Sequence, residues 1–204
     1  MLIGNGLGLT KTSVGPMDNN AYLLTVDGDA LLIDAAAEPD VLLRQLEGLH
    51  LVGVVTTHRH SDHLQALSKV VEATGAPAFA GTPDAAAVTD ATGVTCREVW
   101  DGDSITLGGS ELAVIGVVGH TPGSITLAHT PQDGPARLFT GDSLFPGGVG
   151  KTWRAKDFET LIADVTEKLF GGFDDDTIVH PGHGADTTLG AERPHLDEWR
   201  ARRW

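Results

Sequence analysis

The chain has 204 residues, 41% of them hydrophobic, which is enough to bury the core of one domain over residues 1–204. Its net charge of −14 argues against a nucleic-acid partner, because phosphate backbones are bound by clustered Lys and Arg. The single cysteine, Cys96, excludes an internal disulfide and is typical of a reducing compartment. We see no basic, apolar leader and no run near the roughly 18 apolar residues of a membrane span. We therefore expect a cytoplasmic protein with no membrane partner.

The first elements along the chain are a hairpin and a helix. Residues 22–26 and 30–34 predict two strands around Asp27-Gly28-Asp29, a sequence typical of a turn. The leucine spacing of residues 41–49 predicts a helix. The predicted strands and helices therefore come mixed along the chain.

A cluster of polar residues separates the next predicted strand from the next predicted helix. The apolar, β-branched run 51–56 predicts a strand, and residues 64–71 have helical spacing. Between them lies Thr57-His58-Arg59-His60-Ser61-Asp62-His63. The pattern H-x-H-x-D-H should arise by chance in about one such chain in a thousand. We interpret it as functional, on a strand-to-helix turn where side chains spread around a point.

Imidazole and carboxylate in this spacing favour metal binding, since neutral imidazole and carboxylate are ligands of zinc and iron. His58 and His60 are two residues apart on a tight turn and can face one ion. Asp62 and His63 cannot easily reach the same ion but can reach a second. The sequence therefore predicts a site for two metals.

The second half of the chain supplies further candidate ligands. A hairpin is predicted over 104–107 and 111–118, and an amphipathic helix over 158–170. His129 lies in a strand-like stretch and is expected to be exposed. Three other polar residues lie in segments that follow a strand-like run and turn through Gly or Pro, a position where functional side chains gather: His120, Asp142 and His183.

Over nearly its whole length the chain resembles the metallo-β-lactamase superfamily, and within it the glyoxalase II (hydroxyacylglutathione hydrolase) branch. The resemblance rests on seven segments: Asn19-Asn20-Ala21-Tyr22-Leu23-Leu24, Leu32-Ile33-Asp34, T-H-x-H-x-D-H, G-H-T-P-G-S, T-G-D-S-L-F, P-G-H-G and Asp186-Thr187-Thr188-Leu189-Gly190-Ala191-Glu192. It implies an α+β fold, the four-layer αββα sandwich, with two mixed sheets face to face and helices outside.

The resemblance also implies a ligand set. His58, His60 and His120 would hold the first metal, Asp62, His63 and His183 the second, and Asp142 would bridge them. Two zinc ions are expected, with iron or manganese as alternatives.

The same family implies the chemistry. A hydroxide bridging the two ions would attack the carbonyl of a thioester, and Asp62 and Asp142 would be the catalytic carboxylates. Asp34 matches the family's acidic residue after the second strand and is a candidate for orienting a ligand histidine. An Asp that only ends the strand is the alternative.

The substrate is a small molecule, expected to be an acyl thioester. The segment Gly147–Trp153 resembles the glyoxalase II segment G-C-G-K-x-Y. Lys151 is therefore a candidate anchor for an acidic thiol carrier, with Trp153 in place of the aromatic residue; a solvated Lys is the alternative. Glyoxalase II has a C-terminal helical domain that holds much of the carrier, whereas about twenty residues follow His183 here. Specificity for glutathione is thus left open.

Other activities of the same fold stay open to different degrees. An iron persulfide dioxygenase would use the counterparts of His58, His120 and Asp142. A β-lactamase is disfavoured because such enzymes generally lack the bridging Asp. A lactonase would need a Tyr near the site, and Tyr22 lies on an early strand. A metal-binding scaffold without activity is disfavoured by the complete ligand set.

Overall fold

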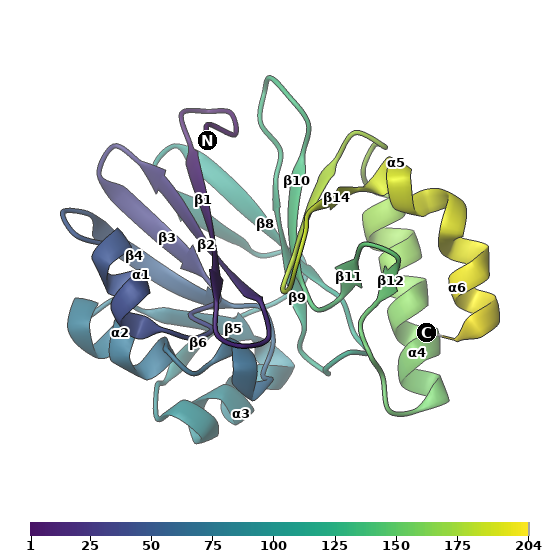
Figure 1. The fold of residues 1–204 in the computed structure, drawn as a ribbon, viewed down its shortest axis with the longest axis horizontal. Helices are drawn as coiled ribbons and strands as arrows, with labels where there is room; N and C mark the ends of the chain where they lie inside the picture. The colour runs from purple at the N-terminus through teal and green to yellow at the C-terminus, as the bar shows by residue number, and fades with distance from the viewer. Residues whose placement is uncertain (204) are drawn as a thin grey trace.

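Two six-stranded sheets pack face to face with helices on both outer faces, in a computed structural model that describes residues 1–203 (Figure 1). Trp204 lies outside the described residues. The four layers confirm the αββα sandwich and the α+β class expected from the sequence. Both sheets contain parallel and antiparallel pairs.

The first sheet follows the chain order of its strands. Its hairpin turns at Asp27-Gly28, both with positive φ, as the sequence predicts. The strands are β1 (Gly8–Val14), β2 (Asn19–Val26), β3 (Asp29–Ile33), β4 (His50–Thr56), β5 (Ala78–Gly81) and β6 (Cys96–Val99).

The second sheet has the order β14-β13-β10-β9-β8-β7 and includes the hairpin predicted around Gly108-Gly109. Its strands are β7 (Ser104–Leu107), β8 (Ser110–Gly116), β9 (Ile125–His129), β10 (Arg137–Gly141), β13 (Ile178–Pro181) and β14 (Thr187–Thr188). A short pair, β11 (Leu144–Phe145) and β12 (Gly148–Val149), lies beside it.

The helices are α1 (Pro39–Gln45), α2 (Leu67–Thr74), α3 (Thr82–Thr92), α4 (Ala155–Asp164), α5 (Leu189–Glu192) and α6 (Leu196–Arg202). Figure 1 shows α1, α2 and α3 on one outer face and α4 and α6 on the other. Three apolar cores fill the spaces between the four layers. In the described residues, no helix has the length and apolar character needed to cross a membrane.

Four details differ from the sequence prediction. The helix expected over 41–49 ends at Gln45, and the helix after the histidine cluster begins at Leu67, after a 3-10 turn over Ser61–His63. The predicted helix 158–170 changes to π-helix at Val165. His129, which was expected to be exposed, is buried with 1% of its surface accessible, because β9 is an inner strand covered on both faces.

Candidate metal centre

The candidate ligands lie in four loops that follow the carboxyl ends of strands. Residues 57–63 follow β4, and the other three loops follow β8, β10 and β13 of the second sheet. These loops bring together all seven predicted ligands from segments up to 125 positions apart: His58, His60, Asp62, His63, His120, Asp142 and His183.

One group of ligand atoms belongs to His58, His60 and His120, which lie within 4.8 Å of one another. The ring centroids of His58 and His120 are 4.9 Å apart, and those of His60 and His120 are 4.5 Å apart. The rings are nearly perpendicular, at 70° and 89°. The rings are therefore arranged around a common point, as three ligands of one ion would be.

A second group consists of Asp62, His63 and His183. Asp62 Oδ2 lies 3.5 Å from His63 Nε2 and 3.3 Å from His183 Nε2, and the two Nε2 atoms are 3.2 Å apart. Asn19 Nδ2 donates a hydrogen bond to Asp62 Oδ2 over 2.9 Å. This carboxylate is thus fixed in direction, and its oxygen faces both imidazoles.

Asp142 lies between the two groups. Its Oδ2 is 3.9 Å from His58 Nε2, 3.5 Å from His120 Nε2 and 3.5 Å from His183 Nε2. Its Oδ1 is 3.3 Å from His63 Nε2. One carboxylate therefore reaches ligand atoms of both groups, which is the geometry that a bridging ligand needs.

The outer ring nitrogens of four of these histidines are held by fixed acceptors. His58 Nδ1 lies 3.0 Å from Thr57 Oγ1, and His63 Nδ1 lies 2.9 Å from Asp34 Oδ2. Main-chain carbonyls hold the other two, at 2.8 Å from His120 Nδ1 and 2.9 Å from His183 Nδ1. With Nδ1 occupied, each ring presents Nε2 to the centre, as is usual for metal-binding histidines.

The donor set fits divalent metal ions. Within the described part of the chain, the buried atoms His58 Nε2, His120 Nε2 and Asp142 Oδ1 have no hydrogen-bond partner, and all three point into the cluster. Buried polar atoms without a partner are costly. A bound zinc or iron ion would supply the missing partner, since both metals bind imidazole nitrogen and carboxylate oxygen.

The protonation of the cluster is set by burial and by its carboxylates. Burial lowers the pKa of His58, His60 and His120, so these rings are neutral near pH 7, the form that binds a metal. Burial also opposes the charged form of His63, but Asp34 and Asp142 raise its pKa to about 10. The carboxylates thus favour positive charge at the centre.

Asp34 is the buried link behind the cluster. It accepts hydrogen bonds from the main-chain N–H of Thr57 over 2.7 Å and from its hydroxyl over 2.8 Å, and it also contacts His63. Its φ is +57°, a left-handed conformation that a merely strand-ending Asp does not require. Of the two sequence interpretations, the geometry favours the orienting role.

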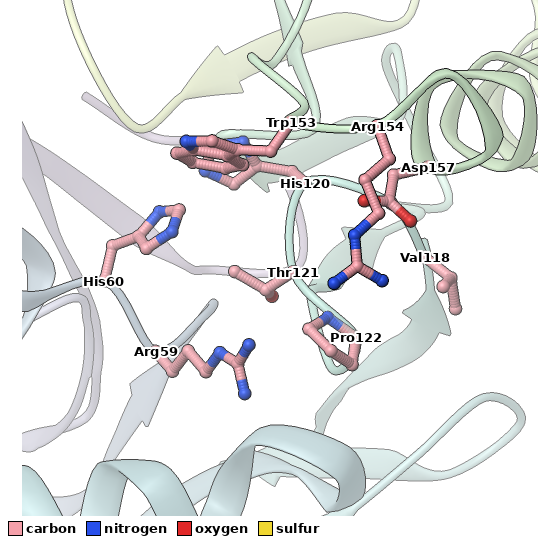
Figure 2. Close-up of a pocket in the computed structure, with 10 residues that line it drawn as sticks. Arg59, His60, Val118, His120, Thr121, Pro122, Trp153, Arg154 and Asp157 are labelled. Atoms are coloured by element: carbon pink, nitrogen blue, oxygen red, sulfur yellow. The ribbon is translucent and has the colours of Figure 1, made fainter.

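The two residues predicted to bind substrate lie near the cluster in different ways. Trp153 is 63% exposed, and its ring centroid is 5.5 Å from that of His60 (Figure 2). Lys151 Nζ lies over the Trp153 ring, 5.9 Å from its centroid, while the carbonyl of Lys151 holds His120. That main-chain contact could not be predicted from residue types.

Sequence reasoning missed two more supports of the cluster. Asn19, which holds Asp62, begins strand β2, and the only signal was a pair of Asn before an apolar strand. The carbonyl of Met17 holds His183, and no side-chain pattern reveals a main-chain acceptor.

Two packed sheets with helices outside, and loops rich in His and Asp gathered at one end, define an αββα metal-binding protein. The model of the metallo-beta-lactamase superfamily matches residues 14–187. The chain belongs to this superfamily, which indicates a metal-dependent hydrolase.

The chain is similar to curated hydrolases. Hydroxyacylglutathione hydrolase GloC of Haemophilus influenzae is 30% identical over 183 residues, covering 81% of this chain and 84% of the relative. A hydroxyacylglutathione hydrolase of Anaeromyxobacter dehalogenans is 34% identical over 172 residues, covering 81% of this chain and 61% of the relative.

The chain is also similar to solved structures. ETHE1 from Myxococcus xanthus has a TM-score of 0.78 and 28% identity, covering 92% of this chain and 82% of that one. BLEG-1 B3 metallo-beta-lactamase has a TM-score of 0.78 and 28% identity, covering 93% and 98%. TTHA1623 in a di-iron-bound form has a TM-score of 0.71 and 31% identity, covering 90% and 96%.

Proposed function

We propose that this protein is a dinuclear zinc hydrolase that cleaves the thioester bond of an S-acyl thiol. The observation that carries the proposal is the convergence of two ligand groups on one bridging carboxylate, with three buried ligand atoms lacking a partner. In this proposal one zinc is held by His58, His60 and His120, the other by Asp62, His63 and His183, and both by Asp142.

When bound, the two ions would supply Lewis acidity and a hydroxide nucleophile at neutral pH. Asp62 is placed to accept a proton at Oδ2, the oxygen that Asn19 already orients. Asp34 and the carbonyl of Lys151 keep His63 and His120 in the tautomer that presents Nε2. Pre-orientation of this kind reduces the reorganisation needed during the reaction.

The thioester is favoured among other carbonyl substrates by two observations. The relatives in Haemophilus influenzae and Anaeromyxobacter dehalogenans are named hydroxyacylglutathione hydrolases. The exposed Trp153 ring stands beside His60 and provides an apolar surface for an acyl or thiol chain. Lys151 remains a candidate anchor for an acidic thiol carrier.

Metal content and a substrate panel test the proposal together. The protein would be expressed with zinc and iron both supplied, and metals per chain would be measured by plasma emission. A panel containing a thioester, a lactone and a β-lactam would then be assayed. We expect about two zinc ions per chain and thiol release from the thioester. Two zinc ions with hydrolysis of only the lactone or the β-lactam would contradict the substrate class.

The bridging role of Asp142 has its own test. Asp142→Ala should lose metal and activity together, because the carboxylate contacts ligand atoms of both groups. The matched control is Asp133→Ala, which removes an exposed carboxylate from a loop. Full hydrolysis with two bound ions in Asp142→Ala would show that the bridge is wrongly assigned.

A second candidate function, persulfide oxidation at a single iron, is favoured by a specific observation. Among the candidate ligands in the described residues, the buried atoms without a partner belong to His58, His120 and Asp142, the same three residues that the dioxygenase resemblance implies. ETHE1 from Myxococcus xanthus also shares the fold at 28% identity. One iron per chain, with oxygen uptake on addition of a persulfide, would establish this function instead.

A further inference from the structure

A pocket of about 550 Å³ opens beside the first ligand group. His60 and His120 form part of its wall, so a molecule in the pocket would lie next to the reacting centre. The remaining lining comes from the loop after β4, the loop between β8 and β9, and the start of α4 (Figure 2): Arg59, Val118, Gly119, Thr121, Pro122, Trp153, Arg154 and Asp157.

Two guanidinium groups enter this pocket from opposite sides. Figure 2 shows Arg59 extending from the side of His60 and Arg154 from the side of Asp157, with Pro122 near both. Arg154 is the N-cap residue of α4, and the Arg59 side chain is 41% exposed. The two arginines come from segments 95 positions apart, so the fold, not a local run of charge, brings them together.

The polar capacity of both groups is largely unused. The Arg154 side chain makes no hydrogen bond or ion pair with residues 1–203. Arg59 approaches the buried Asp84 only through Nε, 3.6 Å from Oδ1, which leaves its two terminal nitrogens directed elsewhere. The one acidic residue in the lining is Asp157. A guanidinium fork matches the two oxygens of a carboxylate or a phosphate.

The net negative charge of the chain distinguishes this pair of arginines from most of the surface. Acidic residues outnumber basic ones by 28 to 14, so most of the surface repels anions. Metal ions at the adjacent centre would add further positive charge to the same pocket. An anion in this pocket would therefore meet positive charge on a surface that is otherwise mostly acidic.

We propose that Arg59 and Arg154 bind an anionic group of the substrate, so that this hydrolase selects S-acyl thiols with a negative charge near the thioester. The proposal rests on the hydrolase function proposed above and adds its specificity. The anionic group can belong to the thiol part or to the acyl part, and the assay below separates these sources. Lys151, which lies over Trp153, is outside this pocket lining.

The test compares three thioesters on zinc-loaded protein by thiol release. S-acetylmercaptosuccinate carries its charge on the thiol part, S-succinyl-N-acetylcysteamine carries it on the acyl part, and S-acetyl-N-acetylcysteamine is neutral. Arg154→Gln should lower kcat/KM at least about tenfold for one charged thioester, mainly through KM, and change the neutral one less than twofold. The thioester that is affected identifies the source of the charge.

Variants separate the pocket from general effects. Arg44→Gln removes one positive charge from an exposed position on α1 and should leave all three substrates unchanged. Arg59→Gln could disturb Asp84, so Arg59→Lys, which keeps the charge, is measured beside it. We expect Arg59→Lys to recover part of the loss, since lysine supplies charge without the fork. Equal losses on charged and neutral thioesters in Arg154→Gln would overturn the proposal.

A binding measurement keeps the proposal testable if no thioester is cleaved. Two compounds that cannot be hydrolysed would be titrated calorimetrically into the zinc-loaded protein and into Arg154→Gln: S-methylmercaptosuccinate, a thioether with the charge of the thiol part, and 4-oxopentanoate, a ketone with the charge of the acyl part. Binding at least fivefold weaker in the variant would support the anion site even if the hydrolase function failed. An unchanged affinity for both compounds in the variant would overturn the anion site whatever the hydrolytic activity.

Discussion

Asp34 Oδ2 lies 2.9 Å from His63 Nδ1, and both side chains are buried. The same distance separates Asp29 Oδ1 from His50 Nδ1 at the other end of β3, where both side chains are exposed. The chain thus carries two Asp–His pairs of equal length in opposite environments. Their comparison measures what burial adds to such a pair.

Asp34→Asn should weaken zinc binding about 10- to 100-fold, because the amide no longer stabilises the Nδ1–H of His63 as a carboxylate does. Asp29→Asn is the matched control and should leave zinc affinity unchanged, since exposed pairs contribute little. Competition with a chelator of known affinity measures both. Equal zinc affinities of the two variants would show that Asp34 does not support the metal centre.

Gly182→Ala should abolish metal binding with less effect on folding. An added Cβ at Gly182 would overlap Asp142 Oδ1 and approach His63 Cε1 to 2.8 Å, so both ligands would have to move. Gly109→Ala is the control, because its added Cβ meets nothing within 4 Å. Metal content and the thermal unfolding midpoint would be measured for both. Normal metal content in Gly182→Ala would contradict the observed packing around Asp142.

Asp84→Asn should loosen the loop that carries His120. The buried Asp84 carboxylate accepts hydrogen bonds from the hydroxyl of Thr121 and from the main-chain N–H groups of Gly123 and Arg59. Weakening such a buried charged acceptor costs about 1–3 kcal/mol in the free energy of unfolding. Asp90→Asn, exposed on the same helix, should change unfolding by less than about 0.5 kcal/mol. Urea unfolding would measure the free energy of unfolding of both variants.

Tyr22 is the only tyrosine, which makes its ionisation directly visible by ultraviolet absorbance. Burial, and next the charge of Asp186, raise the pKa of Tyr22 above its usual value of 10.0. Its hydroxyl donates a 2.6 Å hydrogen bond to the carbonyl of Pro181, which a phenolate cannot do.

Because the pKa of Tyr22 is raised in the folded state, the contribution of its protonated hydroxyl to stability is complete below about pH 10 and decreases above it. We expect no phenolate absorbance from the native protein at pH 10.5, and an increase that coincides with unfolding measured by circular dichroism. Tyr22→Phe should flatten the decline in stability above pH 10. Phenolate formation in a still-folded protein near pH 10 would contradict the buried hydrogen bond.

The positions of elements were predictable where residues repeat with a regular period or cluster in the sequence. The turn at Asp27-Gly28 and the cluster between His58 and His63 fall where the sequence places them. Strand β1 was missed because its buried and exposed positions do not alternate regularly, and α3 was missed because its alanines have no strong apolar face. His129 was misjudged since burial of β9 depends on the layers that cover it.

The seven candidate ligands and the support from Asp34 were predictable as residue types, but the main-chain supports were not. A main-chain carbonyl, such as that of Lys151 or Met17, leaves no mark in a sequence. The pairing of Arg59 with Arg154 across one pocket is also a property of the fold, because the two arginines are 95 positions apart in the chain.

The first four ligand positions follow a strand of one sheet, whereas His120, Asp142 and His183 follow strands of the other. A metal bound by both sets would act as a cross-link between two halves of the polypeptide that separately hold too few ligands. High affinity would arise only after the sheets have docked, so metal uptake would be a late event that reports completed assembly. Once bound, the ions would make separation of the sheets slow, and chelation should speed unfolding more than it slows refolding.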